Sequence, residues 1–374
     1  MRIAVLASNF ISIPPTPTNV PAGYSGAPEM IVHWTVEELV RRGYDVTLFA
    51  AGDCRTSAKL ESVSEVAVSQ MQKKGTEFSL DYELLLASKC YKEAQLGKFD
   101  LIHSHLVSRS AFFASFVKTP TVVTIHSPLD GLAGSVLEHY KKDQHYVSIS
   151  NAQRHPLPDL NYTDTVYHGI DLTGINPNYN RGNYLVFVGR FAPQKGVVDA
   201  VGAAKLAGEE LILFGTESND SNYFDIEVKP LIDKVKIQSY GFIERNKLFE
   251  MLAGAKALLF PIHWEEPFGL VMIEAMATGT PVIAYNRGSV SEIIADGETG
   301  FIIDPISSLS DLNIKETSVD RLVKAIAKIN SMSDNETISM RRNCRSHVEK
   351  NFTIAKMVDG YERVYQKVLN KYHE

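Results

Sequence analysis

Short apolar runs alternate with amphipathic helical stretches along this chain, and the alternation starts twice. Near the N-terminus the order is RIAVLAS, then PEMIVHWTVEELVRRG, then DVTLFAA, which is the pattern of a strand, a helix and a second strand. The runs DLIHSH, PTVVTIHS and HYVSIS follow, and they are apolar along almost their whole length, as are parallel strands buried on both faces. The first half is therefore predicted to be a doubly wound α/β sheet.

The second start follows YHGIDLTGINPNYNRGN, a stretch rich in Gly, Asn and Pro that has no periodicity. After it come the strand-like runs YLVFVGR, LILFGT, KIQSYGFI, ALLFPI, TPVIAYN and TGFIID, with helical stretches between them. A length of 374 residues with 44% hydrophobic content is enough for two cores. We therefore expect two Rossmann-like domains, residues 1–175 and 176–350, with a cleft between the carboxyl ends of their strands.

Two segments lie outside this alternation. The tail, residues 351–374, carries an apolar stripe at helical spacing and is predicted to be a helix packed on a core. The polar segment DPISSLSDLNIKETSVDRL is longer than an ordinary connection, so we expect it to be a surface insertion.

Charge and cysteine usage exclude several classes of function. The net charge is −6, and residues 1–180 hold 15 basic against 18 acidic side chains, so we expect no nucleic-acid partner. The same evenness gives no support for docking on anionic lipid, and peripheral membrane contact is left open. Three cysteines far apart in sequence predict neither a disulfide framework nor a zinc site. Without a signal-peptide pattern or a run of eighteen apolar residues, a cytoplasmic location is expected.

The stretch HWEEPFGLVMIEAMATGTPVIAYN contains two carboxylates eight residues apart, Glu266 and Glu274. Pro267 cannot lie inside a helix, so a helix is predicted to begin near Phe268 or Gly269 and to end at the Gly of ATGTP. The free amide groups at its N-terminus would attract a diphosphate. On an otherwise apolar helix the Glu274 charge needs a partner, and the hydroxyls of a ligand would serve.

A second set of candidate residues comes from the loop VGRFAPQKG, which follows the first strand of the second domain and supplies Arg190 and Lys195. Two cations at the carboxyl end of a strand suit a diphosphate, although each alone would be read as an ordinary surface residue. In the first domain, His126 ends the run VVTIHS, and Ser25-Gly26 precede the first helix. Both are expected to face the cleft, but neither is strong evidence alone.

The run DLIHSH contains two more histidines, His103 and His105, which alternate along a strand. Their spacing places both on one face of the sheet. A metal site is not predicted, because no third ligand at suitable spacing is apparent.

Taken together, GRFAPQKG, EEPFGLVMIEAMATGTPVIA and GSVSEIIADGETGFII resemble the retaining GT-B glycosyltransferases of family 4, and the resemblance extends over nearly the whole chain. It implies a GT-B fold, with two Rossmann-like doubly wound domains facing a central cleft and the last helix crossing back to the first domain. It also implies roles for the candidate residues. Arg190 and Lys195 would bind the donor diphosphate, Glu274 would bind the ribose, and Glu266 would contact the transferred sugar. Phe268, Gly269 and Leu270 would add backbone contacts, His126 would line the donor-sugar pocket, and Gly26 would lie in the phosphate-facing loop.

The same resemblance implies the reaction. A hexose-type sugar would pass from a UDP- or GDP-sugar, which is a substrate rather than a cofactor, to a hydroxyl acceptor such as a cell-surface glycan or glycolipid precursor. The configuration would be retained and no metal would be needed. Two departures from the family are Ser25-Gly26, where many relatives have two glycines, and the turn LFGTES, which is poorer in glycine. The proline-rich segment PPTPTNVPAGYSG suggests a flap over the acceptor side.

Three other functions are compatible with parts of this pattern. A nucleotide-sugar 2-epimerase would share the architecture and the donor site, but it would convert its donor without an acceptor. A nicotinamide dehydrogenase would begin with a similar strand and helix, but the first strand here is not followed by GxGxxG. A binding protein without turnover would not need the full set of acidic and basic residues.

Overall fold

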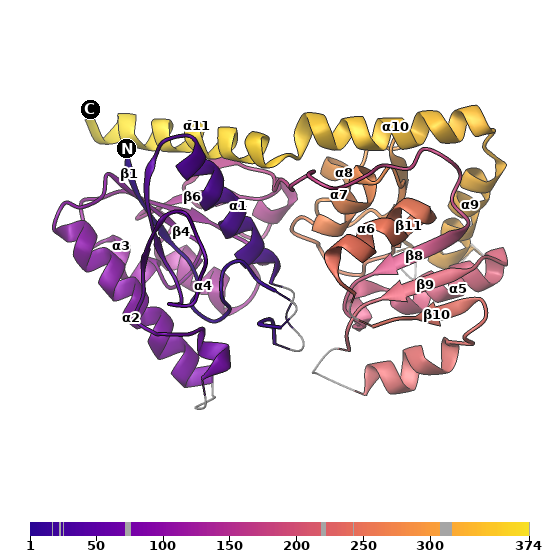
Figure 1. Cartoon of the computed structure of the whole chain (residues 1–374), viewed down its shortest axis with the longest axis horizontal. Helices are drawn as coiled ribbons and strands as arrows, with labels where there is room; N and C mark the ends of the chain where they lie inside the picture. Colours follow the sequence, from indigo (N-terminus) through magenta and orange to yellow (C-terminus); the bar gives the residue numbers. More distant parts are fainter. Residues whose placement is uncertain are drawn as a thin grey trace. The chain divides into compact units, whose positions relative to one another are not determined.

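The computed structural model describes residues 1–16, 18–21, 24, 26–71, 76–217, 222–241, 243–306 and 316–373. The chain forms two compact units (Figure 1): unit 1 is Met1–Asp171 with Thr353–Glu374, and unit 2 is Leu172–Phe352. The first junction lies four residues before the expected boundary at 175, and the tail joins unit 1 from 353 rather than 351. Ser25 and the middle of the expected surface insertion, 307–315, lie outside the described residues.

Unit 1 contains a sheet of seven parallel strands in the order β3-β2-β1-β4-β5-β6-β7. The strands are β1 (Arg2–Leu6), β2 (Asp45–Phe49), β3 (Lys59–Glu61), β4 (Leu101–Ser104), β5 (Thr121–Thr124), β6 (His145–Ser148) and β7 (Tyr162–Thr165). The five strands predicted from apolar runs are confirmed. The sequence did not predict β3 and β7, because KLE and YTDT are short and polar, as suits strands at the two edges of a sheet.

The helices of unit 1 complete its core. They are α1 (Ala27–Arg41), α2 (Thr76–Gln95), α3 (Ala111–Ala114), α4 (Leu132–His139) and α11 (Ile354–His373), with short 3₁₀ turns η1 (Val68–Gln70) and η2 (Ala152–Arg154). Leu86 and Tyr91 of α2 pack against Phe49 and Ile102 of the sheet, and Leu137 of α4 packs in a second cluster with β5 and β6.

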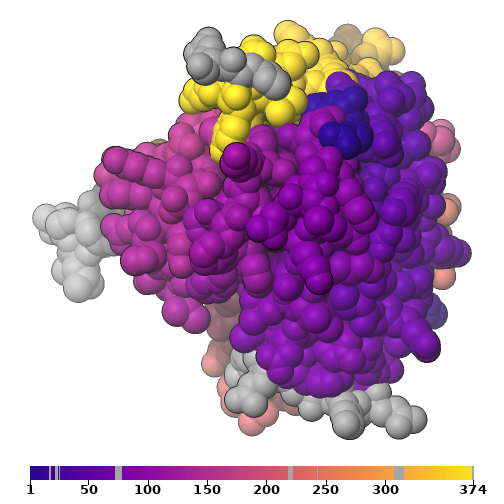
Figure 2. Space-filling view, turned by 90° about the vertical axis from the view of Figure 1, so that its left-hand side faces the viewer, coloured from indigo at the N-terminus to yellow at the C-terminus, as the bar shows by residue number. Residues whose placement is uncertain are grey.

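Helix α11 belongs to unit 1 although it is the last element of the chain. Figure 2 shows it in yellow on this unit, beside the indigo first residues. Its apolar stripe is buried, and Arg42 after α1 lies 2.8 Å from Asp359 and 2.6 Å from Glu362. Buried apolar area therefore supplies most of the attachment, and the ion pairs help to orient the helix.

Unit 2 contains a sheet of six parallel strands in the order β10-β9-β8-β11-β12-β13. The strands are β8 (Tyr184–Val188), β9 (Leu211–Phe214), β10 (Ile237–Ser239), β11 (Ala255–Phe260), β12 (Val282–Tyr285) and β13 (Gly300–Ile303). The helices are α5 (Val197–Ala207), α6 (Arg245–Gly254), α7 (Leu270–Ala277), α8 (Val290–Ile293), α9 (Ser318–Ser331) and α10 (Asp334–Asn351), with short helical turns η3 (Pro193–Lys195), η4 (Phe224–Val228) and η5 (Lys229–Leu231).

The strand orders locate one position in each sheet where ligands are expected. In unit 1 the chain adds strands to one side of β1 and later continues from β4 on the other side, and in unit 2 the same reversal occurs between β8 and β11. Open α/β sheets bind ligands at such a switch point, beyond the carboxyl ends of the strands. The fold thus offers one candidate edge in each unit.

The return of the chain to unit 1 generates a stability prediction. A Cβ atom on Gly169 would lie 2.1 Å from the carbonyl oxygen of Thr353, so Gly169→Ala must displace backbone. We expect a loss of about 1–3 kcal/mol in the unfolding free energy, as for other overpacked sites. Calorimetric unfolding measures it. As a control, Gly202→Ala in α5 meets only Val319 Cγ1 at 3.6 Å and should leave stability equal or slightly higher. Equal unfolding temperatures for the two variants would contradict the prediction.

Candidate functional site

The site in unit 2 is centred on Glu266, in the loop between β11 and α7. Its carboxylate accepts hydrogen bonds from Lys195 Nζ at 2.7 Å and from Trp264 Nε1 at 2.9 Å. Lys195 Nζ also lies 4.6 Å from the centre of the Trp264 ring. Because Glu266 is only 9% exposed, both charges depend on these partners. Trp264 was not predicted as a site residue, although its position two residues before Glu266 was a usable signal.

The backbone of the Glu266 loop is held by the motif GSVSEII. Ser289 donates its N–H to the Glu266 carbonyl at 2.9 Å and its hydroxyl to the Phe268 carbonyl at 2.8 Å. Gly288 has φ +56°, and a Cβ there would lie 2.3 Å from the Glu266 carbonyl oxygen. The glycine and the serine therefore allow two loops, from β11 and β12, to pack together.

Helix α7 begins where the sequence predicted. Gly269 is its N-cap, with φ +79°, and no side chain caps the helix among the described residues. Leu270 is the first helical residue, Phe268 is buried, and Gly279, with φ +83°, follows the last turn. The first amide groups of α7 are available to an anion at the switch point of this sheet.

Glu274 lies one turn into α7 and is paired with Arg245, the first residue of α6. Its Oε1 atom is 3.3 Å from Arg245 Nη2, and its side chain is 18% exposed. Burial raises the pKa of Glu274, and the nearby Arg245 charge opposes that rise. Arg245 was not predicted from the sequence, although a cation at the first position of a helix that follows a strand of this sheet was a usable signal.

The loop after β8 places Lys195 in contact with Glu266, but Arg190, on the same loop, does not take part in this ion pair. Gly196 has φ +71°, and a Cβ there would lie 1.7 Å from the Pro261 carbonyl oxygen, so the loops after β8 and β11 are in close contact. The Arg190 carbonyl accepts from Ala192 N at 2.9 Å. Within the described part of the chain, the Arg190 guanidinium makes no hydrogen bond or ion pair, which leaves a cation for a ligand.

In unit 1, His126 is part of a stack of four histidines near the carboxyl ends of the strands. Ring centres are 4.3 Å apart for His103 and His105, 5.1 Å for His105 and His126, and 5.3 Å for His126 and His168. Burial lowers the pKa of His103 to about 3 and that of His126 to about 4. The stack is therefore uncharged near neutral pH.

His105 and His126 are joined by one short N–H···N hydrogen bond. His105 Nδ1 lies 2.7 Å from His126 Nε2, so one nitrogen donates and the other accepts. The outer nitrogens, His105 Nε2 and His126 Nδ1, are buried and have no partner among the described residues. His126 Nδ1 is thus a buried polar atom that the described residues leave unsatisfied.

His103 and His105 share one face, as their alternation predicted, but their contacts are with protein groups. His103 bonds to Thr124 Oγ1 at 2.8 Å and to the Tyr365 hydroxyl at 2.7 Å. Among the residues that the structure describes, no three His, Cys, Asp or Glu side chains are placed to hold a metal ion.

Gly26 is the N-cap of α1. It has φ +65°, and a Cβ there would lie 2.8 Å from Pro15 Cβ, so this position needs glycine for the backbone alone. Gly26 and His126 belong to unit 1, whereas the other candidate residues belong to unit 2.

Comparison with known proteins identifies the family. The model of the family described as Glycosyl transferases group 1 matches residues 172–347, and that of Glycosyltransferase Family 4 matches residues 29–173. The chain belongs to the group 1 glycosyltransferases. A related sequence, N-acetyl-alpha-D-glucosaminyl L-malate synthase of Bacillus anthracis, is 26% identical over 77% of this chain and 80% of that protein. The chain is therefore a glycosyltransferase.

Solved structures of other glycosyltransferases share the fold. Sucrose-phosphate synthase of Thermosynechococcus elongatus superposes with a TM-score of 0.73 at 18% identity, covering 99% of this chain and all of that one. Anabaena HepE, crystallised with UDP-glucose, gives a TM-score of 0.69 at 16% identity, covering 98% of this chain and all of that one. This glycosyltransferase has the GT-B fold that the sequence predicted.

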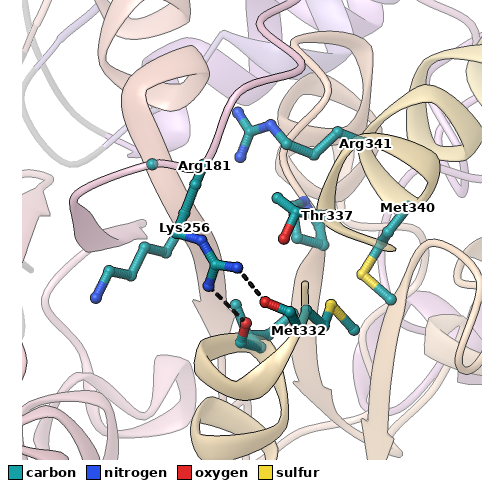
Figure 3. Close-up of a pocket in the computed structure, with 9 residues that line it drawn as sticks. Arg181, Lys256, Met332, Thr337, Met340 and Arg341 are labelled. Atoms are coloured by element: carbon teal, nitrogen blue, oxygen red, sulfur yellow. Dashed lines mark hydrogen bonds between the residues drawn. The ribbon is translucent and has the colours of Figure 1, made fainter. Parts of the chain in front are cut away.

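A small cavity elsewhere in unit 2 of the glycosyltransferase is not a substrate site. Its volume is about 10 Å³, which is room for a single water molecule. Figure 3 shows Arg181 in it, hydrogen-bonded to the backbone carbonyls of Ile329 and Met332. Gly182 and Lys256, which also line it, lie next to the first residues of β8 and β11, so the cavity is at the amino edge of the sheet.

In the described ranges of the glycosyltransferase, no helix is both long enough and apolar enough to cross a membrane.

The neutral histidines predict acid sensitivity of the glycosyltransferase. Unfolded histidines take up protons near pH 6.5, whereas folded His103 and His126 do so only near pH 3 and pH 4. Because the unfolded state binds more protons in this window, stability should fall as the pH drops from about 6.5 to about 4. Replacing His103 by Gln should reduce the slope of melting temperature against pH, even if the variant is less stable overall.

The matched control for this prediction is His139→Gln, which changes an exposed histidine of α4 and should keep the wild-type slope. An unchanged slope in His103→Gln would mean that His103 is not held neutral by the fold.

Proposed function

We propose that this glycosyltransferase moves a hexose-type sugar from a UDP- or GDP-sugar to a hydroxyl acceptor, with retention of configuration and without a metal. The observation that carries the proposal is the convergence at the switch point of unit 2, where Lys195 meets Glu266 beside the N-terminus of α7. Arg190, without a protein partner among the described residues, lies on the same loop as Lys195. Such a site suits an anionic donor and a leaving group that gains negative charge.

Positive charge for the donor diphosphate comes from three sources in unit 2. Arg190 can bind two oxygens with its planar guanidinium, and Lys195 adds a point charge. The uncapped amide groups at the start of α7, opened by Gly269, add hydrogen bonds and the positive end of a helix dipole. These groups would stabilise the departing nucleoside diphosphate in place of a metal ion.

The choice of donor is supported by a structural neighbour. Anabaena HepE has been crystallised with UDP-glucose, and its fold covers almost the whole of this chain. We therefore favour a uridine diphosphate sugar over a guanosine diphosphate sugar. Glu274 would bind the ribose hydroxyls, since its buried carboxylate needs hydrogen-bond donors beyond Arg245.

Glu266 is assigned to the transferred sugar. It lies at the entrance to α7, where its carboxylate accepts hydrogen bonds from Lys195 and Trp264. A carboxylate there would stabilise positive charge as it develops on the sugar ring. By the family resemblance, His126 would contribute to the donor-sugar pocket.

Retention is proposed from the family resemblance alone.

Donor turnover tests the proposed reaction. UDP- and GDP-sugars are incubated with the protein, and donor and products are followed by mass spectrometry. A transferase releases nucleoside diphosphate slowly by hydrolysis and faster with a suitable acceptor, whereas an epimerase would convert the donor to an isomer without any acceptor. The relatives and structures described above give no support to the epimerase alternative.

The two glutamates should respond differently to substitution. Glu274→Gln should weaken UDP binding about tenfold or more, because hydrogen bonds to a charged group contribute about 1.5–3 kcal/mol, while kcat changes little. Glu266→Gln should bind UDP nearly as the wild type does but lower kcat by about 10²- to 10³-fold, as when other charge-stabilising groups are removed. Calorimetry with UDP and steady-state kinetics measure the two effects.

The matched control is Glu298→Gln, an exposed glutamate of unit 2, which should alter neither quantity. If Glu266→Gln lost UDP affinity and Glu274→Gln lost only kcat, the two assigned roles would be reversed.

Activity should not depend on a divalent metal, because Arg190, Lys195 and the start of α7 supply the charge. Release of UDP should proceed at the same rate after dialysis against EDTA as with added Mg²⁺ or Mn²⁺. Complete loss on chelation, reversed by either ion, would refute metal independence without refuting the glycosyltransferase assignment.

A further inference from the structure

Trp264 lies in the loop between β11 and α7, two residues before Glu266, and it is half-buried. Its indole N–H donates to Glu266 Oε2 at 2.9 Å, and Lys195 Nζ donates to the same oxygen at 2.7 Å. Lys195 Nζ also lies 4.6 Å from the centre of the Trp264 ring. Each of the three side chains therefore contacts the other two.

The two oxygens of the Glu266 carboxylate have different surroundings. Both donors meet Oε2, whereas Oε1 accepts no hydrogen bond from the described residues. An ionised carboxylate accepts on both oxygens, so Oε1 keeps its capacity to meet a hydrogen-bond donor or a developing positive charge. Oε1 is thus the oxygen left for a ligand.

The backbone around Trp264 is fixed on both sides. On one side, His263 donates its N–H to the Gln194 carbonyl at 2.9 Å, in the turn η3 that carries Lys195. On the other side, the Glu266 carbonyl accepts from Ser289 N at 2.9 Å. The indole is therefore presented from a loop that hydrogen bonds hold at residues 263 and 266.

Of the two partners of Glu266, the indole is the one that can fix the direction of the carboxylate. An ammonium group ends a flexible stem and has three rotatable donors, so Lys195 can follow the carboxylate as it turns. The indole has a single N–H, which lies in the plane of a rigid ring. An acceptor that keeps this hydrogen bond is confined to one direction, which in turn determines where Oε1 lies.

We propose that Trp264 is a positioning residue for the transfer reaction: its N–H holds Glu266 Oε2, so that Oε1 is presented to the transferred sugar. A carboxylate that turned away would stabilise less of the positive charge that develops on the sugar ring, while the groups assigned to the nucleoside diphosphate would be unaffected. The inference rests on the proposed function, because it depends on the role assigned there to Glu266.

The kinetic test uses Trp264→Phe, which removes the N–H and keeps an aromatic ring. This variant should lower kcat for donor turnover about tenfold or more, since a hydrogen bond to a charged group is lost, and it should keep UDP affinity near the wild-type value. Steady-state kinetics and calorimetry with UDP measure the two effects. Wild-type kcat, or a folded variant that loses UDP affinity as much as kcat, would overturn the inference.

A double-mutant cycle separates the orientation of Glu266 from any other role of the indole. In a Glu266→Ala background there is no carboxylate to orient, so the addition of Trp264→Phe should not lower kcat further. If the losses from the two substitutions are fully additive, the indole acts independently of Glu266 and the positioning role is refuted.

A spectroscopic measurement detects the hydrogen bond itself. The chain contains two tryptophans, so selective ¹⁵N labelling gives two indole signals, and Trp34→Phe identifies the one that belongs to Trp264. Glu266→Ala removes the charged acceptor and should move the Trp264 N–H proton signal upfield. A signal that does not move would show that Trp264 does not bind Glu266 in solution, which contradicts the inference even if Trp264→Phe cannot be purified in folded form.

Trp34→Phe is also the matched kinetic control. Trp34 is buried in α1 of unit 1, and its replacement should leave kcat and UDP affinity unchanged even if it lowers the melting temperature. Absence of both donor turnover and UDP binding in the wild type would overturn the proposed function, whereas normal turnover in Trp264→Phe would overturn this inference alone.

Discussion

The contact between Lys195 and Glu266 joins the loops that follow the two central strands of unit 2, and the proposed donor site depends on it. Either charge alone would be costly at this depth, so the residues are useful only as a pair. Trp264 donates a second hydrogen bond to the same carboxylate. The pair and the indole thereby hold the two loops in one arrangement.

Local pattern was enough to predict the strands, the start of α7 and the loop cations. Apolar runs mark strands buried on both faces, and Pro267 with Gly269 determines where a helix can begin. The short polar edge strands and the partners of the site residues could not be predicted in this way. His168 stacks on His126 from 42 residues away, and Arg245 pairs with Glu274 from 29 residues away, so neither contact leaves a local signal.

The two switch points differ in charge. In unit 2 the loops supply Arg190, Lys195 and a helix N-terminus, which suit a diphosphate. In unit 1 the histidine stack is neutral near neutral pH, and Arg109 lies 2.8 Å from Glu83. The same fold thus presents side chains of different charge at equivalent strand ends of its two sheets.

Three arginines of unit 2 show why partners, rather than residue type, identify a binding group. Arg341 is buried and donates to the carbonyls of Asn178, Ala253 and Ala255, and Arg181 bonds to carbonyls near the end of α9. Both lie toward the amino edge of the sheet, where their donors are used to hold the chain in place. Arg190 lies at the carboxyl edge, and in the described structure its five N–H donors have no protein acceptor. A guanidinium left unsatisfied at that edge is available to a ligand, which is why we propose that a donor diphosphate binds there.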